Sequence, residues 1–144
     1  ISELIKIKHK KSKNLILGNI YAERDWGYAD DYVEAMWKML QQKKPEDYVI
    51  SSGMINSVKT FINKASNYLG FDLKWTGSGL NEKGIDSATD RVIIKIDKKF
   101  FRPIDIQYKH GKSDKAKKNL NWKPKTNFDN LVKLICDAEL KKYK

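Results

Sequence analysis

Cysteine, histidine, proline and arginine are scarce in this 144-residue sequence, and the first two scarcities already exclude some chemistry. A single cysteine, Cys136, cannot form a disulfide within the chain, which is typical of proteins from a reducing compartment such as the cytoplasm. Apolar residues surround Cys136, so we expect a buried thiol and not a nucleophile. His9 and His110 are too far apart to form a metal site by spacing, and we predict no bound metal.

Long hydrophobic runs are also missing. No apolar stretch approaches the roughly 18 residues of a membrane helix, and no secretory signal pattern is visible, so we expect no membrane partner. The 40% hydrophobic and 11% aromatic content is nevertheless enough for a folded core of one domain, or of one large piece of a bigger protein. The first residue is Ile1 and not methionine, which indicates a fragment, a processed product or a trimmed chain.

Positive charge is abundant but comes almost entirely from lysine. The net charge is +11, yet the chain has only three arginines, at positions 24, 91 and 102. Proteins that read nucleic acids usually rely on arginine for bidentate contacts with bases and phosphates. A basic nucleic-acid-binding module and a protein with a small anionic ligand both remain open, and the arginines are the residues to inspect.

Helical and strand-like segments alternate along the chain, which predicts an α/β fold. Strands are expected at 15–17, 48–50, 71–75 and 92–96, and helices at 31–42, 57–69, around 116–120 and from about 127. Residues 76–90 are polar and are expected to form a loop. In the 31–42 helix, Asp31 is expected to cap the start, and we expect the following residues, spaced i, i+3, i+4 and i+7, to pack in the core: Val33, Met36, Trp37 and Leu40.

Arg24 lies at a turn between Gly18-Asn19 and the first strong helix, next to the apolar Trp26. A half-buried arginine in such a place is suited to a carboxylate or phosphate ligand. A salt bridge to Asp25 or Asp30 is the equally weighted alternative.

Arg102 forms a second candidate anion site, because Phe101 and Pro103 hold it in a stiff, apolar setting. Asp105 follows closely, and its two carboxylate oxygens suit the neighbouring hydroxyls of a ribose. Two arginines and one carboxylate together suit a nucleoside diphosphate, although local ion pairs are again the alternative. The Gly77-Ser78-Gly79 stretch is too short for a dinucleotide-binding fingerprint, and no apolar helix follows it.

The run RDWGYADDYVEAMWKMLQQ, residues 24–42, resembles the segment RDWG-x-A-x-DYVEAMW-x-MLQQ of the GDP-mannose 4,6-dehydratases. The similarity extends to LGN at 17–19, PEDYVI at 45–50, and FRP at 101–103 with Asp105 where the family has Glu. Residues 115–124 also resemble the family's C-terminal region, so essentially the whole chain is covered.

This resemblance implies the C-terminal part of an extended short-chain dehydrogenase/reductase. Residues 1–70 would complete the edge of the NADP-binding Rossmann domain, and residues 71–144 would form the smaller sugar-nucleotide-binding domain. The family oxidises C4 of GDP-mannose with NADP, eliminates water across C5 and C6, and returns the hydride to C6. The product is GDP-4-keto-6-deoxy-mannose, and the family's enzymes are usually oligomers in the cytoplasm.

The resemblance also assigns a substrate-binding set in this chain. It comprises Arg24 and Arg102 on the diphosphate, Asp105 near the ribose, Asn19 near the nucleotide, and Tyr28 as a further candidate. The family's glycine-rich turn and Thr-x-Glu pair are not in this sequence, and the resemblance implies that the catalytic Tyr-x-x-x-Lys pair lies in the family's N-terminal half, outside this chain. Catalytic and cofactor-binding residues are therefore expected outside this chain, which we predict to be inactive by itself. The alternatives are a related sugar-nucleotide epimerase or dehydratase, and the basic nucleic-acid-binding module.

Overall fold

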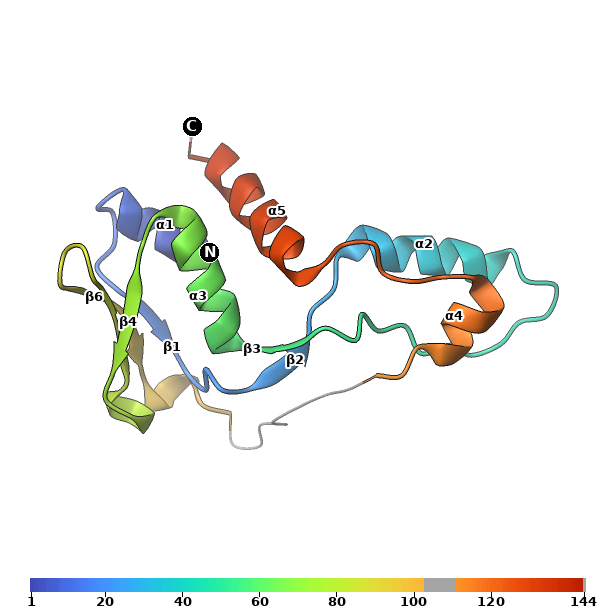
Figure 1. The fold of residues 1–144 in the computed structure, drawn as a ribbon, viewed down its shortest axis with the longest axis horizontal. Helices are drawn as coiled ribbons and strands as arrows, with labels where there is room; N and C mark the ends of the chain where they lie inside the picture. The colour runs from blue at the N-terminus through green and yellow to red at the C-terminus, as the bar shows by residue number, and fades with distance from the viewer. Residues whose placement is uncertain (103–110, 144) are drawn as a thin grey trace.

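Helices and strands alternate in a computed structural model, which describes residues 1–102 and 111–143 and confirms the α/β class (Figure 1). The helices are α1 (Ser2–Lys8), α2 (Ala29–Leu40), α3 (Val58–Leu69), α4 (Asp114–Leu120) and α5 (Phe128–Lys141), with short 3-10 turns η1 (Gly79–Asn81) and η2 (Lys98–Phe100). The strands are β1 (Leu15–Leu17), β2 (Glu23–Asp25), β3 (Ile55–Ser57), β4 (Leu73–Thr76), β5 (Lys83–Asp86) and β6 (Arg91–Ile96). No helix in the described ranges is long and apolar enough to cross a membrane.

The strands form two sheets. The larger has the order β1-β6-β5-β4, in which β1 runs parallel to β6 and the other pairs are antiparallel. The smaller is the antiparallel pair of β2 and β3. Because β1 and β6 are parallel, their carboxyl ends lie at the same edge of the sheet, and the segments that follow them start side by side.

The main core lies between the large sheet and helices α1, α3 and α5 (Figure 1). Helix α3 illustrates how the sequence builds it. The Ser57 side chain accepts a hydrogen bond from the Thr60 backbone N–H at 3.0 Å, and Gly70 ends the helix with φ 90°. Ile62, Ala65 and Leu69 of α3 are buried, as the spacing predicts.

A second, smaller core joins α2 to α4. Ala35 packs there with Ala116, Leu120 and Trp122, all at most 5% exposed. The Trp122 indole N–H donates to the Asp31 carbonyl, and the Asp31 carboxylate accepts the Thr126 backbone N–H. The prediction that Asp31 caps α2 is therefore wrong: Tyr28 is the N-cap residue, and Asp31 ties α2 to the segment before α5.

The predicted burial of one apolar face of α2 is wrong. Ala35 faces α4, and the opposite side of the helix carries a stripe of side chains that no described residue covers. The exposed fractions are 60% for Val33, 60% for Met36, 61% for Trp37 and 82% for Leu40. We call these four residues the α2 stripe. Its spacing is that of a buried face, yet these side chains are exposed among the described residues.

Three other sequence predictions need correction. Residues 48–50 form no strand, because a strand needs a neighbour for its N–H and C=O groups; the strand of this region is β3. Residues 76–90 are not one loop, since β5 pairs with both β4 and β6. In the helix from about 127, the spacing predicts that Ala138 shares the apolar face of Phe128, Leu131, Val132 and Ile135, but in α5 Ala138 is exposed and Cys136 is buried.

Candidate functional site

The two segments that carry the predicted anion-binding arginines begin at one edge of the large sheet. The Asp97 backbone N–H, just after β6, donates to the Leu17 carbonyl at the end of β1, at 2.8 Å. Gly18 lies directly against the Phe100 carbonyl, where an added Cβ atom would overlap the carbonyl oxygen. The 18–19 turn and the 100–102 segment are therefore neighbours, which the sequence could not establish because 82 residues separate them.

The connector between β1 and β2, residues 18–22, is held by hydrogen bonds along its length. The Asn19 side chain accepts the Tyr21 backbone N–H at 3.0 Å, which closes a tight local turn. The first turn of α3 adds two backbone bonds, from Lys59 to the Ile20 carbonyl at 2.7 Å and from Val58 to the Ala22 carbonyl at 3.2 Å. Asn19 and the residues that follow thus have a defined position.

Arg24 sits on β2, where its backbone pairs with Asn56 of β3. The residue is half-buried, and one of its guanidinium nitrogens donates to the Glu23 carbonyl at 2.7 Å. The guanidinium is attached to a paired strand, which restricts the directions it can take. Such restriction is what a recognition arginine needs, because less freedom is lost when it binds a planar anion.

Asp25, the next residue of the RDWG motif, has a structural role. One carboxylate oxygen accepts bonds from the Ser52 backbone N–H at 2.9 Å and the Ser52 hydroxyl at 2.6 Å, and the other accepts the Gly53 N–H at 2.9 Å. The Tyr32 hydroxyl lies 3.4 Å away, and burial together with the Asp25 charge raises the Tyr32 pKa. These contacts tie β2 to the 51–54 segment.

Trp26 anchors the other side of β2. Its indole N–H donates to the Asn56 carbonyl at 2.8 Å, and its ring stacks on Phe61 of α3 with centroids 4.5 Å apart. The RDWG turn is therefore built on a rigid base, with its acid and its tryptophan turned to the protein. Sequence spacing indicated that Trp26 was apolar support, but it did not reveal the role of Asp25.

The remaining predicted site residues fall in three places. Arg102 is exposed and follows η2, next to the 18–19 turn. Asp105 lies outside the described residues. Tyr28 lines a hollow of about 400 Å³ together with α5 residues, and its hydrogen bond to Asp30 raises its pKa. The structure thus brings the Asn19 turn and the Arg102 segment together, and it puts Tyr28 beside α5.

A cluster of polar and aromatic side chains lies next to the 18–22 connector and was not predicted from the sequence. Glu82 is only 3% exposed, and it contacts Lys59 at 2.6 Å and the Tyr21 hydroxyl at 2.9 Å. Burial lowers the Lys59 pKa, but the hydrogen bonds to Glu82 and Tyr21 outweigh it, and the net pKa is raised. The one signal in the sequence was a lysine in the first turn of a helix, where the helix dipole disfavours a cation.

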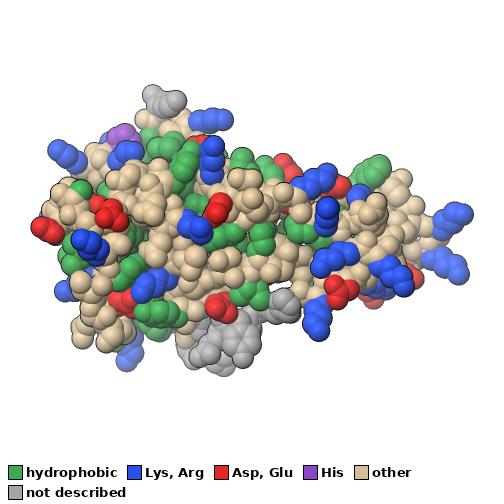
Figure 2. All heavy atoms as spheres, in the orientation of Figure 1, with side chains coloured by type: hydrophobic (Ala, Val, Ile, Leu, Met, Phe, Trp, Pro, Cys, Tyr) green, Lys and Arg blue, Asp and Glu red, His purple; other side chains and the backbone are tan. Residues whose placement is uncertain are grey.

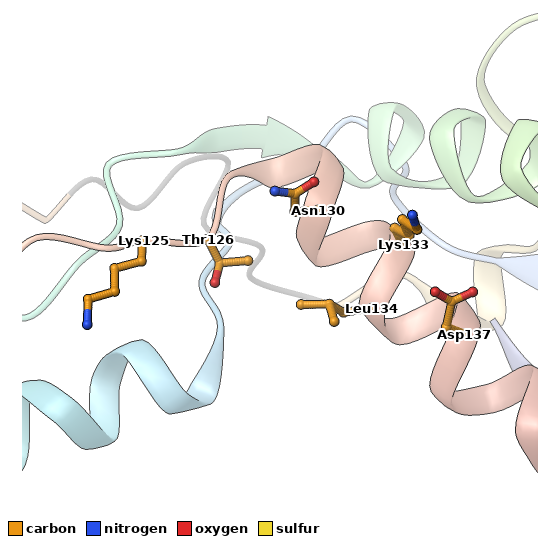
Figure 3. Close-up of a pocket in the computed structure, with 6 residues that line it drawn as sticks. All are labelled: Lys125, Thr126, Asn130, Lys133, Leu134 and Asp137. Carbon is orange, nitrogen blue, oxygen red and sulfur yellow. The ribbon is translucent and has the colours of Figure 1, made fainter.

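A hollow of about 300 Å³ runs along α5 and the segment before it (Figure 3). It is lined by Lys125, Thr126, Asn130, Lys133, Leu134 and Asp137. None of the four predicted substrate-binding residues that the structure describes lines it. The hollow is therefore a separate surface feature, on the side of α5 that the main core leaves open.

The described residues do not fit a dinucleotide cofactor. A pyrophosphate site of that kind needs a glycine-rich turn between a strand and the N-terminus of a helix. Gly77 and Gly79 follow β4, but the 3-10 turn η1 and strand β5 come next. Within 1–102 and 111–143, no group of histidine, cysteine, aspartate or glutamate side chains could hold a metal ion. Cys136 is buried, as predicted.

The fold is shared with part of several solved proteins, among them a UDP-glucose 4-epimerase and a dTDP-glucose 4,6-dehydratase. RMD from Pseudomonas aeruginosa, solved with NADPH, superposes with a TM-score of 0.74 over 98% of this chain and 41% of its own, at 15% identity. The dTDP-glucose 4,6-dehydratase of Bacillus anthracis, solved with NAD, has a TM-score of 0.71 over 96% of this chain and 38% of its own, at 18% identity.

Sequence comparison narrows this class to one family. The family model for GDP-mannose 4,6 dehydratase matches residues 1–135, and the chain belongs to that enzyme family. The GDP-mannose 4,6 dehydratase of Drosophila melanogaster is 42% identical over 94% of this chain, and that of Dictyostelium discoideum is 47% identical over 88%. The human enzyme is 44% identical over 86%. The chain spans about a third of the length of these relatives.

Proposed function

We propose that this chain is the C-terminal, substrate-binding part of a GDP-mannose 4,6-dehydratase, which converts GDP-mannose to GDP-4-keto-6-deoxy-mannose. The family match over residues 1–135 carries the proposal, together with the 42–47% identity to relatives of that name. The structure of the RDWG turn also supports the proposal, because the pairing of β2 with β3 fixes the backbone of Arg24.

In this proposal Arg24 and Arg102 bind the diphosphate of the substrate. Two guanidinium groups suit a pyrophosphate because each can donate two parallel hydrogen bonds to phosphate oxygens. The contact of Gly18 with Phe100 supports a shared site, since it joins the two segments at one sheet edge. Asn19 lies near the nucleotide, Asp105 binds the ribose, and Tyr28 is a further candidate contact.

The rest of the enzyme would cover the α2 stripe. Four apolar side chains at 60–82% exposure are spaced as a buried face, and the relatives are about three times as long as this chain. Residues 1–70 would then complete the edge of a Rossmann domain, and residues 71–144 would form most of the sugar-nucleotide domain.

Cofactor and catalytic groups belong, in this proposal, to residues outside the chain. NADP would bind to the missing glycine-rich turn, because the turn at Gly77 and Gly79 has no helix to receive a pyrophosphate. The reaction's Tyr-x-x-x-Lys pair would lie there too. We further propose a cytoplasmic enzyme that forms homo-oligomers.

Two rival functions remain distinguishable. A related sugar-nucleotide epimerase is disfavoured by relatives at 40–47% identity that all carry the dehydratase name. A nucleic-acid-binding module would use the lysines, which on the face in Figure 2 are scattered among acidic side chains. Tighter binding of mixed-sequence DNA than of GDP-mannose by the intact protein, at physiological salt, would favour the second rival.

The proposal is tested with GDP-mannose and NADP. The longer protein should form the 4-keto product, and the 144-residue chain alone should form none. In the longer protein, Arg24→Ala and Arg102→Ala should each weaken GDP-mannose binding by roughly tenfold or more, through lost charge-assisted hydrogen bonds. Arg91→Ala removes the third arginine, at the exposed start of β6, and is the matched control. Turnover by the chain alone, or equal loss in all three variants, would sink the proposal.

A further inference from the structure

Four side chains from four segments form a cluster beside the connector that leads to Arg24. We call Tyr21, Lys59, Trp75 and Glu82 the Lys59 cluster. The Lys59 ammonium lies 2.6 Å from a Glu82 carboxylate oxygen and 3.3 Å from the Tyr21 hydroxyl. It also lies 5.1 Å from the centre of the Tyr21 ring and 4.6 Å from that of Trp75.

The cluster is tightly interconnected. The Tyr21 hydroxyl is 2.9 Å from both Glu82 carboxylate oxygens, and the Trp75 indole N–H donates to the Asn63 side chain of α3 at 2.8 Å. The four segments are the connector before β2, the first turn of α3, strand β4 and the end of η1. One ammonium group therefore links elements that are up to 61 residues apart in sequence.

Stability is a weak reason for such an arrangement. Glu82 is 3% exposed, and the cost of removing a carboxylate from water can exceed what its ion pair returns. Lys59 additionally lies in the first turn of α3, where the helix dipole opposes a cation. What an ion pair with a buried carboxylate and several hydrogen bonds does provide is one defined geometry for the segments that it joins.

We propose that the Lys59 cluster consists of positioning residues for the diphosphate site, and this rests on the proposed function of Arg24. Tyr21 lies two residues after Asn19 and three before Arg24, in the connector whose backbone is already bonded to α3. The side-chain cluster adds contacts from Tyr21 to Lys59 of α3 and to Glu82. Because Glu82 neutralises Lys59, the cluster itself does not bind the anion, and it acts through Arg24.

The test uses the longer protein and two variants, Tyr21→Phe and Glu82→Gln. Each should lower affinity for GDP by roughly tenfold, because a displaced guanidinium loses its aligned contacts with the diphosphate. Affinity for guanosine, which lacks phosphates, should not change. Tyr21 is 58% exposed, so removal of its hydroxyl leaves the fold intact even if Glu82→Gln does not fold. Lys64→Met, which breaks an exposed α3 ion pair with Asp129, is the matched control.

A double-mutant comparison with Arg24→Ala distinguishes a positioning role of the Lys59 cluster from a general loss of structure. In an Arg24→Ala background, Tyr21→Phe should cause no further loss of GDP affinity. Wild-type GDP affinity in both cluster variants, or an equal fall for GDP and guanosine, overturns the inference. Failure of the wild-type protein to bind GDP is a different result, since it overturns the proposed function on which the inference rests.

Discussion

Gly18 and Phe100 lie backbone against backbone at the end of the parallel strand pair, with no room for a side chain at position 18. This contact is where the turn that leads to Arg24 meets the segment that leads to Arg102. Glycine is needed here for a close approach and not for an unusual φ angle. A side chain at position 18 is therefore expected to disturb both the fold and the proposed ligand site.

Gly18→Ala should lower the free energy of unfolding by about 1–3 kcal/mol, because the new Cβ atom forces the two segments apart. It should also weaken GDP-mannose binding in the longer protein. Urea denaturation and calorimetric titration measure the two effects. Gly53→Ala is the control, since its Cβ would meet no atom within 4 Å and only the backbone cost of φ 75° remains, about 1 kcal/mol. Equal effects at both positions would contradict the overlap.

Trp37 should behave differently in the two lengths of chain. In the 144-residue chain it is 61% exposed, and Trp37→Ala should change the unfolding free energy by less than about 0.5 kcal/mol. In the longer protein the α2 stripe is expected to be covered, and the same change should cost about 3 kcal/mol. Trp122→Ala is the control, because Trp122 is 1% exposed and should be costly in both. A small effect of Trp37→Ala in both lengths would contradict a covered stripe.

Asp25 should matter for stability and not only for ligand binding. Asp25→Asn replaces a carboxylate that accepts bonds from Ser52 and Gly53, and it should cost about 1–3 kcal/mol of unfolding free energy. Asp129→Asn, at an exposed surface ion pair, should cost less than about 0.5 kcal/mol. Thermal and urea unfolding of the two variants make the comparison, and equal costs would argue against a structural role for Asp25.

Cys136 should make stability depend on pH in the alkaline range. Burial raises its pKa from 9.0 to about 11 in the folded state. Between these values the folded thiol keeps its proton while the unfolded thiol loses it, so the unfolding free energy should fall as pH rises from 9 to 11. Below pH 9 this contribution is fully present.

Comparison with Cys136→Ala isolates this effect from the titration of lysines and tyrosines. The difference in unfolding free energy between the two proteins should shrink as pH rises through that window. The native thiol should also resist a disulfide reagent at pH 8 and react once the chain is unfolded. Fast reaction of the folded protein would show that the thiol is accessible.

Local signals in the sequence were reliable where the structure is decided within a few residues. The helix expected at 57–69 is α3, where Ser57 is the cap and Gly70 the end, and the β-branched run at 92–96 is the expected strand β6. These features depend on capping, on a positive φ angle and on side-chain branching, all of which are local. The RDWG motif likewise predicts a role for Arg24 from consecutive residues alone.

Sequence patterns that depend on a neighbouring segment gave wrong predictions of burial and of strand structure. The α2 stripe has the spacing of a core face but is exposed, and residues 48–50 have the composition of a strand but pair with nothing described. Both predictions assumed a neighbour. In the proposed function, the neighbour of the α2 stripe belongs to the rest of the enzyme, since the relatives are about three times as long as this chain.

The sequence by itself determined the α/β class, the family, the extent of α3 and the two arginines of interest, because periodicity, side-chain branching and motifs depend on residues that are close in sequence. Only the tertiary structure decided which segments meet. The contact of Gly18 with Phe100 and the burial of Glu82 against Lys59 and Tyr21 join residues far apart in the chain. No spacing rule encodes such contacts, since they arise from sheet order and helix packing.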